Sequence, residues 1–355
     1  MPSSRPLPPG STIGILGGGQ LGRMTAMAAA RLGYPCIVYA PDEDPVAAQV
    51  CAGHVRGAYE DAEALTRFAA QVDVVTYEFE NVPEAAVLEC EKLKPVRPGV
   101  KPIHFAQHRL REKDFLRKLG IGTADYEPIR TEADIAAATA LPGILKTCTE
   151  GYDGKGQARV ADRAELSAAW ARLGRRECIL EAMVDFDCEV SAIVARGLDG
   201  ATRCFPIGIN GHRDGILRTT TVPARLSPAL RSDAVLIAAR ILNALDYVGV
   251  MGVELFVTAK GLLVNEIAPR VHNSGHWTQA GCTVDQFEQH IRAVAGLPLG
   301  DGGRYADVVM ENLIGDDVLR VPDLLKARDT AVHLYGKGAP RPGRKMGHVN
   351  RITRP

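Results

Sequence analysis

Short apolar segments alternate with longer amphipathic ones through the first hundred residues of the chain. Apolar runs that suit strands cover residues 12–16, 36–39 and 72–76, and apolar side chains recur at helical spacing over residues 20–33, 61–70 and 83–91. Helices fit between such strands because a crossover between parallel strands needs a dozen or more residues. The alternation therefore predicts an α/β domain with a parallel sheet and helices on both faces.

Proline and glycine mark two boundaries further along. Residues 93–102 contain three prolines and one glycine, and residues 296–298 read Gly-Leu-Pro. Between them we expect helices at 108–119, 163–173, 227–245 and 284–295, strands at 141–147, 178–183, 189–196, 202–209 and 216–222, and a hairpin at 250–268. The sequence thus predicts three domains, 1–100, 101–297 and 298–355, of which the middle one is α+β and the last consists of short strands.

The charge balance argues against a polyanionic or membrane partner. Forty-two Lys and Arg offset forty-two Asp and Glu, so no net field attracts nucleic acid or a membrane surface. No uncharged apolar run reaches the roughly 18 residues of a membrane span, and the N-terminal residues carry no signal-like apolar segment. The eight cysteines form no C-x-x-C pair, which is typical of reduced core thiols. We expect a cytoplasmic protein without nucleic-acid or membrane partners.

A glycine loop follows the first expected strand. Residues 17–22, GGGQLG, match the G-x-G-x-x-G pattern of dinucleotide-binding domains, and Asp42 lies where such domains place an acidic residue on the ribose. The loop alone permits an NAD-dependent oxidoreductase, and a tight turn that packs helix on strand is the structural alternative. The chain lacks a sixth-strand pattern, and its richest polar motifs lie downstream, which weighs against the oxidoreductase. In either case, glycines let backbone N–H groups approach an anion at a helix N-terminus.

The hairpin expected at 250–268 brings two glutamates together. If a three-residue turn is centred on Lys260, Glu254 and Glu266 lie opposite each other on one face, with Cβ atoms about 5 Å apart. Like charges so placed repel unless a cation or a proton lies between them. Asn265 adds an amide oxygen, and these ligand types favour Mg²⁺. Two solvated surface glutamates are the structural alternative.

A glycine-rich segment with nearby cations suits a triphosphate. Lys146 ends an expected strand, and residues 149–156, TEGYDGKG, follow with three glycines. Backbone N–H groups of such a loop can bind phosphate oxygens while the lysine neutralises charge, although the G-K-[ST] of a Walker A motif is absent. A glycine-rich hairpin tip is the alternative. Glu181 and Glu189, further along, suit an adenine amine or a ribose hydroxyl, or are ordinary strand-edge charges.

Two more polar segments follow the hairpin. Residues 269–277, PRVHNSGHW, place five hydrogen-bonding side chains within nine residues, which neither a core segment nor a simple turn explains. The planar fork of Arg270 suits a transferring phosphoryl group. Residues 341–348, RPGRKMGH, form a compact basic segment that suits a small phosphate or a solvated tail.

Six segments, in order over nearly the whole chain, resemble the N5-carboxyaminoimidazole ribonucleotide synthetase family of the ATP-grasp superfamily. They are GGGQLGRM at 17–24, GYDGKGQ at 151–157, HRDGILRTT at 212–220, YVGVMGVE at 247–254, NEIAPRVHNSGHWTQ at 265–279 and RPGRKMGH at 341–348. The fifth is specific to this family. The glycine-rich loop and the paired glutamates are shared by ATP-grasp enzymes generally.

The resemblance implies a fold and a reaction. The expected fold has a Rossmann-like N-terminal domain, a central ATP-grasp domain that holds ATP between two lobes, and a small C-terminal β domain. Family members use ATP to join bicarbonate to 5-aminoimidazole ribonucleotide in de novo purine biosynthesis. The products are N5-carboxyaminoimidazole ribonucleotide, ADP and phosphate, with carboxyphosphate as the expected intermediate. The implied cofactors are ATP and Mg²⁺, and the implied assembly is a homodimer.

The resemblance also implies residue roles. The expected metal ligands are Glu254 and Glu266. ATP contacts are expected at Arg109, Lys146, Gly151, Tyr152, Asp153, Gly154, Lys155, Gly156, Gln157, Glu181, Val184, Glu189, His212, Asn265 and Glu266. By analogy with formate-dependent glycinamide ribonucleotide transformylases, the ribonucleotide is expected at Gln20, Leu21, Glu78, Asn273, Lys337, Arg344 and Lys345. Catalytic roles fall to Tyr152, Asp153, Arg270, His272 and Lys345. Lys155 stands where many relatives carry Arg, which keeps the charge but not the bidentate geometry.

Three other functions fit parts of the sequence. A carboxylate–amine ligase or a formate-using transformylase would use the same ATP site with a different acceptor. An NAD-dependent oxidoreductase would use the first glycine loop. A regulatory ATP binder would need no acceptor, and the paired glutamates, Arg270 and the second glycine loop together favour an enzyme over it.

Overall fold

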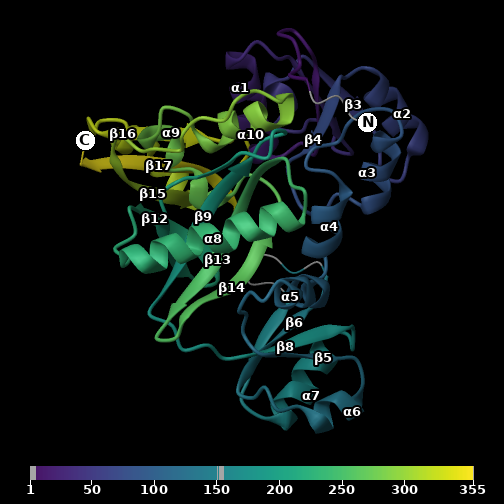
Figure 1. Ribbon diagram of the computed structural model, residues 1–355, viewed down its shortest axis with the longest axis vertical. Helices are drawn as coiled ribbons and strands as arrows, with labels where there is room; N and C mark the ends of the chain where they lie inside the picture. Colours follow the sequence, from purple (N-terminus) through teal and green to yellow (C-terminus); the bar gives the residue numbers. More distant parts are fainter. Residues whose placement is uncertain (1–4, 150, 152–155, 355) are drawn as a thin grey trace.

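Three β-sheets organise the chain in the computed structural model, which describes residues 5–149, 151 and 156–354 (Figure 1). The N-terminal sheet is parallel, with strand order β3-β2-β1-β4, and confirms the alternation seen in the sequence. Its strands are β1 Ile13–Leu16, β2 Cys36–Ala40, β3 Gly53–Arg56 and β4 Val74–Tyr77, and its helices are α1 Gln20–Arg31, α2 Ala62–Ala70 and α3 Glu84–Glu91. Strand β3 was not predicted because it lies at the sheet edge, is only partly buried and carries few apolar side chains.

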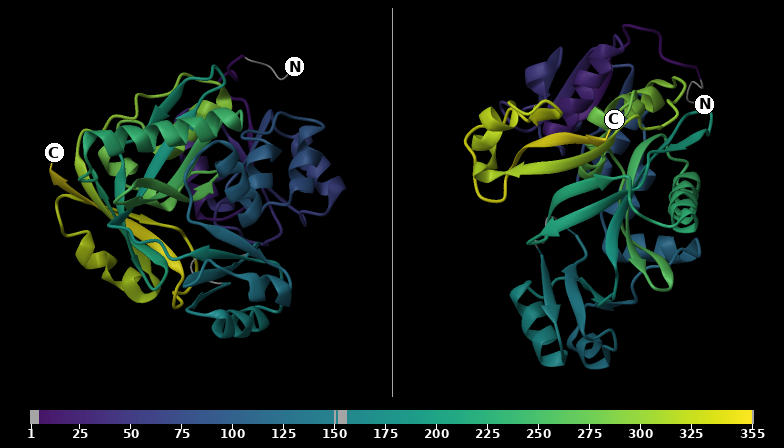
Figure 2. Two further views of the ribbon diagram at one scale, coloured as in Figure 1. Left: turned by 60° about the horizontal axis from the view of Figure 1, so that its bottom comes forward. Right: turned by 90° about the vertical axis from the view of Figure 1, so that its left-hand side faces the viewer.

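A small antiparallel sheet forms a separate lobe, which projects from the rest of the molecule (Figure 2). Its order is β5-β8-β6-β7, with β5 Tyr126–Ile129, β6 Gly143–Thr147, β7 Gln157–Val160 and β8 Cys178–Ala182, and it packs against α6 Glu132–Ala137 and α7 Arg163–Arg172. Helices α4 Val100–Ala106 and α5 Arg109–Lys118 connect it to the N-terminal domain. Part of the predicted boundary at 93–102 therefore belongs to α4.

The large sheet has nine strands among the described residues. Its order is β14-β13-β9-β11-β12-β15-β17-β16, and β10 also pairs with β9. The bounds are β9 Cys188–Arg196, β10 Thr202–Cys204, β11 Gly208–Arg213, β12 Ile216–Val222, β13 Gly249–Thr258, β14 Gly261–Ala268, β15 Asp307–Ile314, β16 Thr330–Leu334 and β17 Lys345–Arg354. The C-terminal strands thus continue the central sheet through β12 and β15. The strand expected at 202–209 is two strands, with Pro206, which has no N–H to donate, between them.

Helices cover the large sheet and join it to the N-terminal domain. The remaining helices are α8 Pro228–Ala244, α9 Thr278–Gly281, α10 Gln286–Ala295 and α11 Val321–Leu324, with 3₁₀ turns at Ala48–Val50, Asn273–Gly275 and Gly315–Arg320. Helix α8 packs on β9 and β13, while α10 contacts both β13 and α1. One buried apolar cluster accordingly includes Ile13 of the N-terminal sheet and Val250 and Met310 of the large sheet. This shared core fixes the N-terminal domain against the large sheet.

Side-chain caps explain why several helix starts were predictable. Asp61, Asp162 and Ser227 each accept a hydrogen bond from a backbone N–H in the first turn of α2, α7 and α8. Pro228 follows Ser227 at the first helical position, where proline is favoured. Gly296 ends α10 in the left-handed region, at φ 75°.

The structure also bears on the cysteines and on membrane-spanning helices. All eight cysteines are free thiols. No helix in the described part of the chain combines the length and the apolar character that crossing a membrane requires.

Candidate active site

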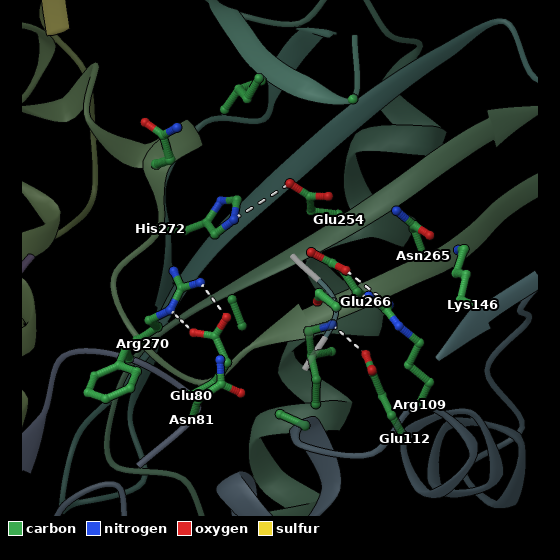
Figure 3. A pocket seen from close by; sticks show the side chains of 18 of the residues that line it. Glu80, Asn81, Arg109, Glu112, Lys146, Glu254, Asn265, Glu266, Arg270 and His272 are labelled. Carbon is green, nitrogen blue, oxygen red and sulfur yellow. Dashed lines mark hydrogen bonds and ion pairs between the residues drawn. The ribbon is translucent and has the colours of Figure 1, made fainter. Parts of the chain in front are cut away.

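A polar cavity of about 690 Å³ lies where the three sheets meet. It is lined by the carboxyl end of β4, the N-terminus of α5, strands β6 and β7 of the small lobe, and β13 and β14 of the large sheet (Figure 3). Predicted residues that line it are Gln20, Leu21, Glu78, Arg109, Lys146, Gly151, Gln157, Glu189, His212, Glu254, Asn265, Glu266, Arg270, His272, Asn273 and Lys345. Segments far apart in the sequence thus converge on one chamber.

The two hairpin glutamates face each other, but the reason differs from the predicted one. Thr258 pairs with Gly261, so the turn has two residues and not three. A β-bulge then shifts the register, and Glu254 pairs with Glu266. The extra residue in the bulge is Asn265, and both Asn265 and Glu266 line the cavity. In a regular strand these neighbours would point to opposite faces.

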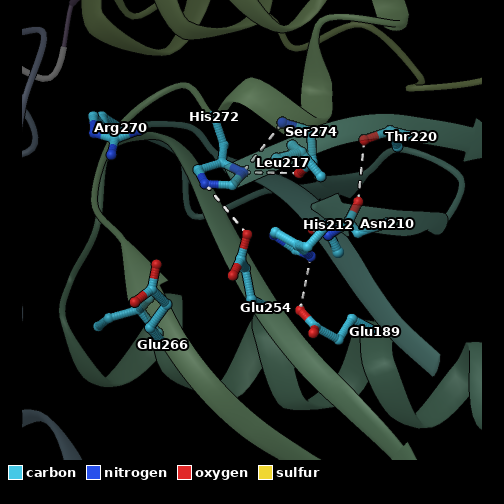
Figure 4. Close-up of polar contacts among 12 residues, drawn as sticks. Glu189, Asn210, His212, Leu217, Thr220, Glu254, Glu266, Arg270, His272 and Ser274 are labelled. Atoms are coloured by element: carbon cyan, nitrogen blue, oxygen red, sulfur yellow. Dashed lines mark hydrogen bonds and ion pairs between the residues drawn. The ribbon is translucent and has the colours of Figure 1, made fainter. Parts of the chain in front are cut away.

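The carboxylates on this face repel one another. The Glu254 side chain is largely buried, and its burial together with the charges of Glu266 and Glu189 raises its pKa well above the ordinary value. The ligand atoms of Glu189, His212 and Glu254 lie within 4.8 Å of one another, close enough to share a metal ion (Figure 4). A divalent cation would relieve the repulsion, and carboxylate and amide oxygens are ligands that Mg²⁺ accepts. The oxygens of Glu254, Glu266 and Asn265 therefore fit the predicted metal, and Glu189 offers a further carboxylate near Glu254.

His272 lies behind the carboxylates as a neutral ring. Its Nδ1 receives a hydrogen bond from the Ser274 N–H, 3.3 Å away, so the neutral ring carries its proton on Nε2, which lies 3.6 Å from Glu254 Oε1 (Figure 4). Burial and the positive charges of Arg270 and Lys345 lower the pKa of His272 to about 3. The residue can donate a hydrogen bond into the cavity but does not carry a charge near neutral pH.

Cations line the wall of the cavity next to Glu266. Arg109 Nη1 lies 3.6 Å from Glu266 Oε2, and Arg109 Nη2 donates to the Gly151 carbonyl at 3.1 Å. Lys146 Nζ donates to Glu181 Oε2 at 2.8 Å. Burial alone would raise the pKa of Glu181, but Lys113 and Lys146 hold it below its ordinary value. A polyphosphate between this wall and the hairpin would meet cations on one side and carboxylates on the other, which a metal ion could bridge.

The first glycine loop is already filled by a side chain. Glu78, just after β4, accepts hydrogen bonds from the backbone N–H groups of Gly19 and Gly22 at the N-terminus of α1. A Cβ at position 19 would lie 2.6 Å from Glu78 Oε1, so glycine is required for this approach. The N–H groups that a dinucleotide pyrophosphate would use are therefore engaged. This arrangement does not support the oxidoreductase alternative.

Arg270 is held by a residue that the sequence analysis missed. Its Nε and Nη2 donate to the two carboxylate oxygens of Glu80, with 3.0 Å for the Nη2 contact, and its Nη1 donates to the Val271 carbonyl at 3.1 Å (Figure 3). Burial alone would raise the pKa of Glu80, but the charge and hydrogen bonds of Arg270 lower it to about 2. The guanidinium fork thus ties the N-terminal domain to the segment after β14 and presents its charge to the cavity.

Asn273 presents an unused amide to the cavity. Its Nδ2 and Oδ1 are both buried, and neither has a hydrogen-bond partner among the described residues. Leaving a buried polar group unpaired costs about 1–3 kcal/mol. Such a group beside a polar cavity indicates a ligand contact.

Comparison with known proteins shows which family the chain resembles. Three family models match in order: the ribonucleotide synthetase preATP-grasp domain at residues 11–107, the ATP-grasp domain at 114–287, and the phosphoribosylaminoimidazole carboxylase C-terminal domain at 308–354. The N5-carboxyaminoimidazole ribonucleotide synthase of Brucella melitensis is 51% identical over 98% of this chain and 97% of its own. The chain belongs to the N5-carboxyaminoimidazole ribonucleotide synthase family.

Solved structures of the N5-carboxyaminoimidazole ribonucleotide synthase family agree over almost the whole chain. The ADP complex of one such synthetase superposes with a TM-score of 0.95 at 40% identity, covering 99% of this chain and 94% of that one. The Aspergillus clavatus enzyme, in complex with ADP and 5-aminoimidazole ribonucleotide, gives 0.90 at 32% identity, covering 97% and 94%. The predicted fold class is thereby confirmed, whereas the domain boundaries and the roles of individual residues remain predictions.

Several predicted residues of the synthase site lie outside the cavity wall. Glu181 is buried behind Lys146, and Val184 follows the end of β8. Gly156, Lys337 and Arg344 do not line the cavity: Lys337 Nζ lies 5.7 Å from the centre of the Tyr335 ring, and Arg344 Nη1 donates to the Ala339 carbonyl at 3.3 Å. Tyr152, Asp153, Gly154 and Lys155 lie outside the described residues.

The sequence analysis also missed two residues on α5, of which Glu112 lines the cavity and Lys113 is buried. Glu112 and Lys113 follow Arg109 by three and four positions, so all three share one helix face. That spacing was visible in the sequence once Arg109 had been assigned to ATP. Glu80 had a weaker signal, since it lies two residues after Glu78 beyond the carboxyl end of a parallel strand, where ligands commonly bind.

Proposed function

We propose that this chain carboxylates 5-aminoimidazole ribonucleotide with bicarbonate and ATP, forming N5-carboxyaminoimidazole ribonucleotide, ADP and phosphate in purine biosynthesis. The observation that carries the proposal is the single cavity in which the hairpin carboxylates, the cationic wall and the residues of the N-terminal domain meet. Family membership and the Aspergillus clavatus complex with ADP and 5-aminoimidazole ribonucleotide support the same substrates.

The cavity suggests where each substrate would bind. ATP would lie along Lys146, Arg109, Gly151 and Gln157, with its triphosphate facing the hairpin. Mg²⁺ would be held by Glu254 and Glu266 and would neutralise charge on the phosphates. The ribonucleotide would lie on the side of the N-terminal domain, within reach of Gln20, Leu21, Glu78, Asn273 and Lys345, with Lys337 and Arg344 as further contacts.

The reaction needs bicarbonate to be activated before the amine attacks. A bicarbonate oxygen attacks the γ-phosphorus of ATP, the bond to the β-phosphate oxygen breaks, and ADP leaves carboxyphosphate behind. Arg270 and the Nε2–H of His272 face this region and would orient the bicarbonate. The exocyclic amine of the ribonucleotide then forms its bond to the carboxyl carbon, directly or after release of CO₂, and phosphate departs. Asp153 and Lys345 are the proposed groups for proton handling and placement of the carboxylate, with His272 behind them, and Tyr152 is a further proposed catalytic residue.

The proposed reaction can be tested by substrate dependence. Purified protein with Mg-ATP and ¹⁴C-bicarbonate is expected to release ADP only when 5-aminoimidazole ribonucleotide is present. For each ADP released, one ¹⁴C atom should appear in an acid-labile carboxylated ribonucleotide. Formate in place of bicarbonate is the control for a transformylase. ADP release that requires formate or another acceptor, without label in the ribonucleotide, would retain the ATP-grasp assignment and refute the named reaction.

Replacement of Asn273 separates substrate binding from folding. Asn273→Ala is expected to raise KM for 5-aminoimidazole ribonucleotide about tenfold, the effect of losing about 1.4 kcal/mol of hydrogen bonding, and to change KM for ATP less than about twofold. The thermal midpoint is not expected to fall, because the amide has no partner among the described residues without ligand. Initial rates and thermal unfolding measure the two effects.

Asn210 is the matched control for Asn273. Its amide donates to Ser191 Oγ at 2.6 Å and accepts from Thr220 Oγ1 at 3.1 Å, so Asn210→Ala should lower the midpoint. A destabilised Asn273→Ala protein with an unchanged KM for the ribonucleotide would contradict the assignment.

The proposed assembly is a homodimer, on the basis of the family resemblance. Size-exclusion chromatography with light scattering is expected to give twice the 38.1 kDa chain mass.

A further inference from the structure

Two side chains of α5 contact the backbone on either side of Glu266. Lys113 Nζ donates to the Asn265 carbonyl at 2.6 Å, and Glu112 Oε1 accepts from the Ile267 N–H at 2.6 Å. Strand β14 lies at the end of the large sheet, and on its outer edge the Val264 N–H donates to the Gly122 carbonyl at 2.8 Å, while no named strand of the described residues pairs with it there. The side chains of Glu112, labelled in Figure 3, and Lys113 bind the backbone of β14 at the bulge.

Burial makes these two contacts unusual. Glu112 is 3% exposed and Lys113 1% exposed. Burying charged side chains is costly, and apolar residues of similar size would often be at least as stable in their place. Stabilising α5 against β14 therefore does not by itself explain why a glutamate and a lysine occupy these positions.

Their contacts connect the hairpin to the cationic wall. Lys113 Nζ also lies 3.7 Å from Glu181 Oε1, and Glu181 pairs with Lys146. Arg109, one helical turn before Lys113, lies 3.6 Å from the Glu266 carboxylate. Helix α5 thus holds the peptide groups before and after Glu266 and also contacts its side chain.

We infer that Glu112 and Lys113 are positioning residues that fix the bulge at Asn265 and so aim Glu266 at the metal ion. The inference rests on the proposed function, in which Glu266 binds Mg²⁺. Groups that orient a metal ligand typically change metal affinity or activity by about 10–100-fold when removed. A bulge without these bonds would let Glu266 leave its position opposite Glu254.

Binding of Mn²⁺ in the presence of ADP tests the inference without turnover. Free Mn²⁺ can be followed by its EPR signal, with Mn²⁺ as the probe for the Mg²⁺ site. Glu112→Leu and Lys113→Met are each expected to weaken Mn²⁺ binding about tenfold or more. Glu112→Gln keeps an oxygen that can accept from the Ile267 N–H and is expected to remain within about threefold of the unmodified protein. Lys118→Met, exposed on the same helix, is the control.

A second readout separates positioning from general damage. KM for 5-aminoimidazole ribonucleotide is expected to change less than about twofold in Glu112→Gln and Lys113→Met, because that substrate would bind on the other side of the cavity. If Glu112→Leu does not fold, Lys113→Met and Glu112→Gln decide the question.

The outcomes distinguish this inference from the proposed function. Folded variants that bind Mn²⁺ as tightly as the unmodified protein would overturn the positioning role alone. The same conclusion would follow if Glu112→Gln lost as much affinity as Glu112→Leu, since the acceptor geometry would then be irrelevant. An unmodified protein that bound no Mn²⁺ with ADP would refute the metal assignment itself, and the inference with it.

Discussion

Replacing Glu254 with glutamine is expected to lower kcat/KM by about 1,000-fold or more, which corresponds to about 4 kcal/mol of lost transition-state stabilisation. Glutamine keeps the size of the side chain but removes the charge that would neutralise and hold Mg²⁺. The Glu254 carboxylate lies directly opposite Glu266 across the hairpin. The metal ion would therefore lose one of its two predicted carboxylate ligands. Initial rates over a range of Mg²⁺ concentrations measure the loss, and Glu63→Gln, at an exposed position, is the control.

The same substitution is expected to stabilise the ligand-free protein. Burial and the charges of Glu266 and Glu189 raise the pKa of Glu254, so the folded state opposes its ionisation. A group with a raised folded pKa destabilises the fold increasingly as pH rises above its unfolded pKa of about 4.3. Glutamine removes this cost. A Glu254→Gln protein that unfolds at a lower temperature than the unmodified protein, or that retains its stabilisation by Mg-ADP, would contradict the assignment.

Local patterns were sufficient to predict most of the fold. The strands β1, β2 and β4 carry continuous apolar side chains, and helices such as α2 and α8 begin at capping residues that can be read directly from the sequence. Elements with weak apolar patterns were missed, such as β3 and the split between β10 and β11. The joining of β15 to β12 depends on contacts between segments that lie far apart, which no local pattern encodes.

The hairpin shows how a correct pairing can come from an incorrect geometry. A three-residue turn and a two-residue turn followed by a bulge both place Glu254 opposite Glu266. Only the second brings Asn265 and Glu266 to the same cavity. A bulge depends on what packs against the strand, here two residues of α5 that lie about 150 positions earlier in the chain. The sequence around the hairpin contains no sign of them.

The contacts that Glu80 and Glu78 make could not be predicted for the same reason. Glu80 contacts Arg270 across 190 positions, and Glu78 fills the first glycine loop from 59 positions away. The loop sequence GGGQLG is therefore compatible with two functions until the occupant of its N–H groups is known. Motif resemblance resolved this ambiguity, whereas spacing within the loop could not.

The buried side chain of His290, which does not line the cavity, gives a prediction of how stability depends on pH. His290 of α10 accepts a hydrogen bond from the Val250 N–H at Nδ1, 3.1 Å away, and its Nε2 lies 2.9 Å from Thr76 Oγ1. The neutral ring with its proton on Nε2 satisfies both contacts. Protonation of Nδ1 would place two donors against each other, and burial lowers the pKa of His290 to about 4. The residue links α10, β13 and β4, so its protonation would disrupt the junction between the domains.

His290→Gln is expected to make the protein less sensitive to acid. Because the folded pKa of about 4 lies below the unfolded value of about 6.5, the unfolded chain binds the extra proton first as pH falls. The stabilisation is complete above pH 6.5 and decreases by about 2 kcal/mol by pH 5. A glutamine amide can keep both hydrogen bonds without titrating. Unfolding midpoints between pH 7.5 and 5 should therefore fall less for His290→Gln than for the unmodified protein or the edge-strand control His54→Gln, and parallel profiles would show that another group sets the acid sensitivity.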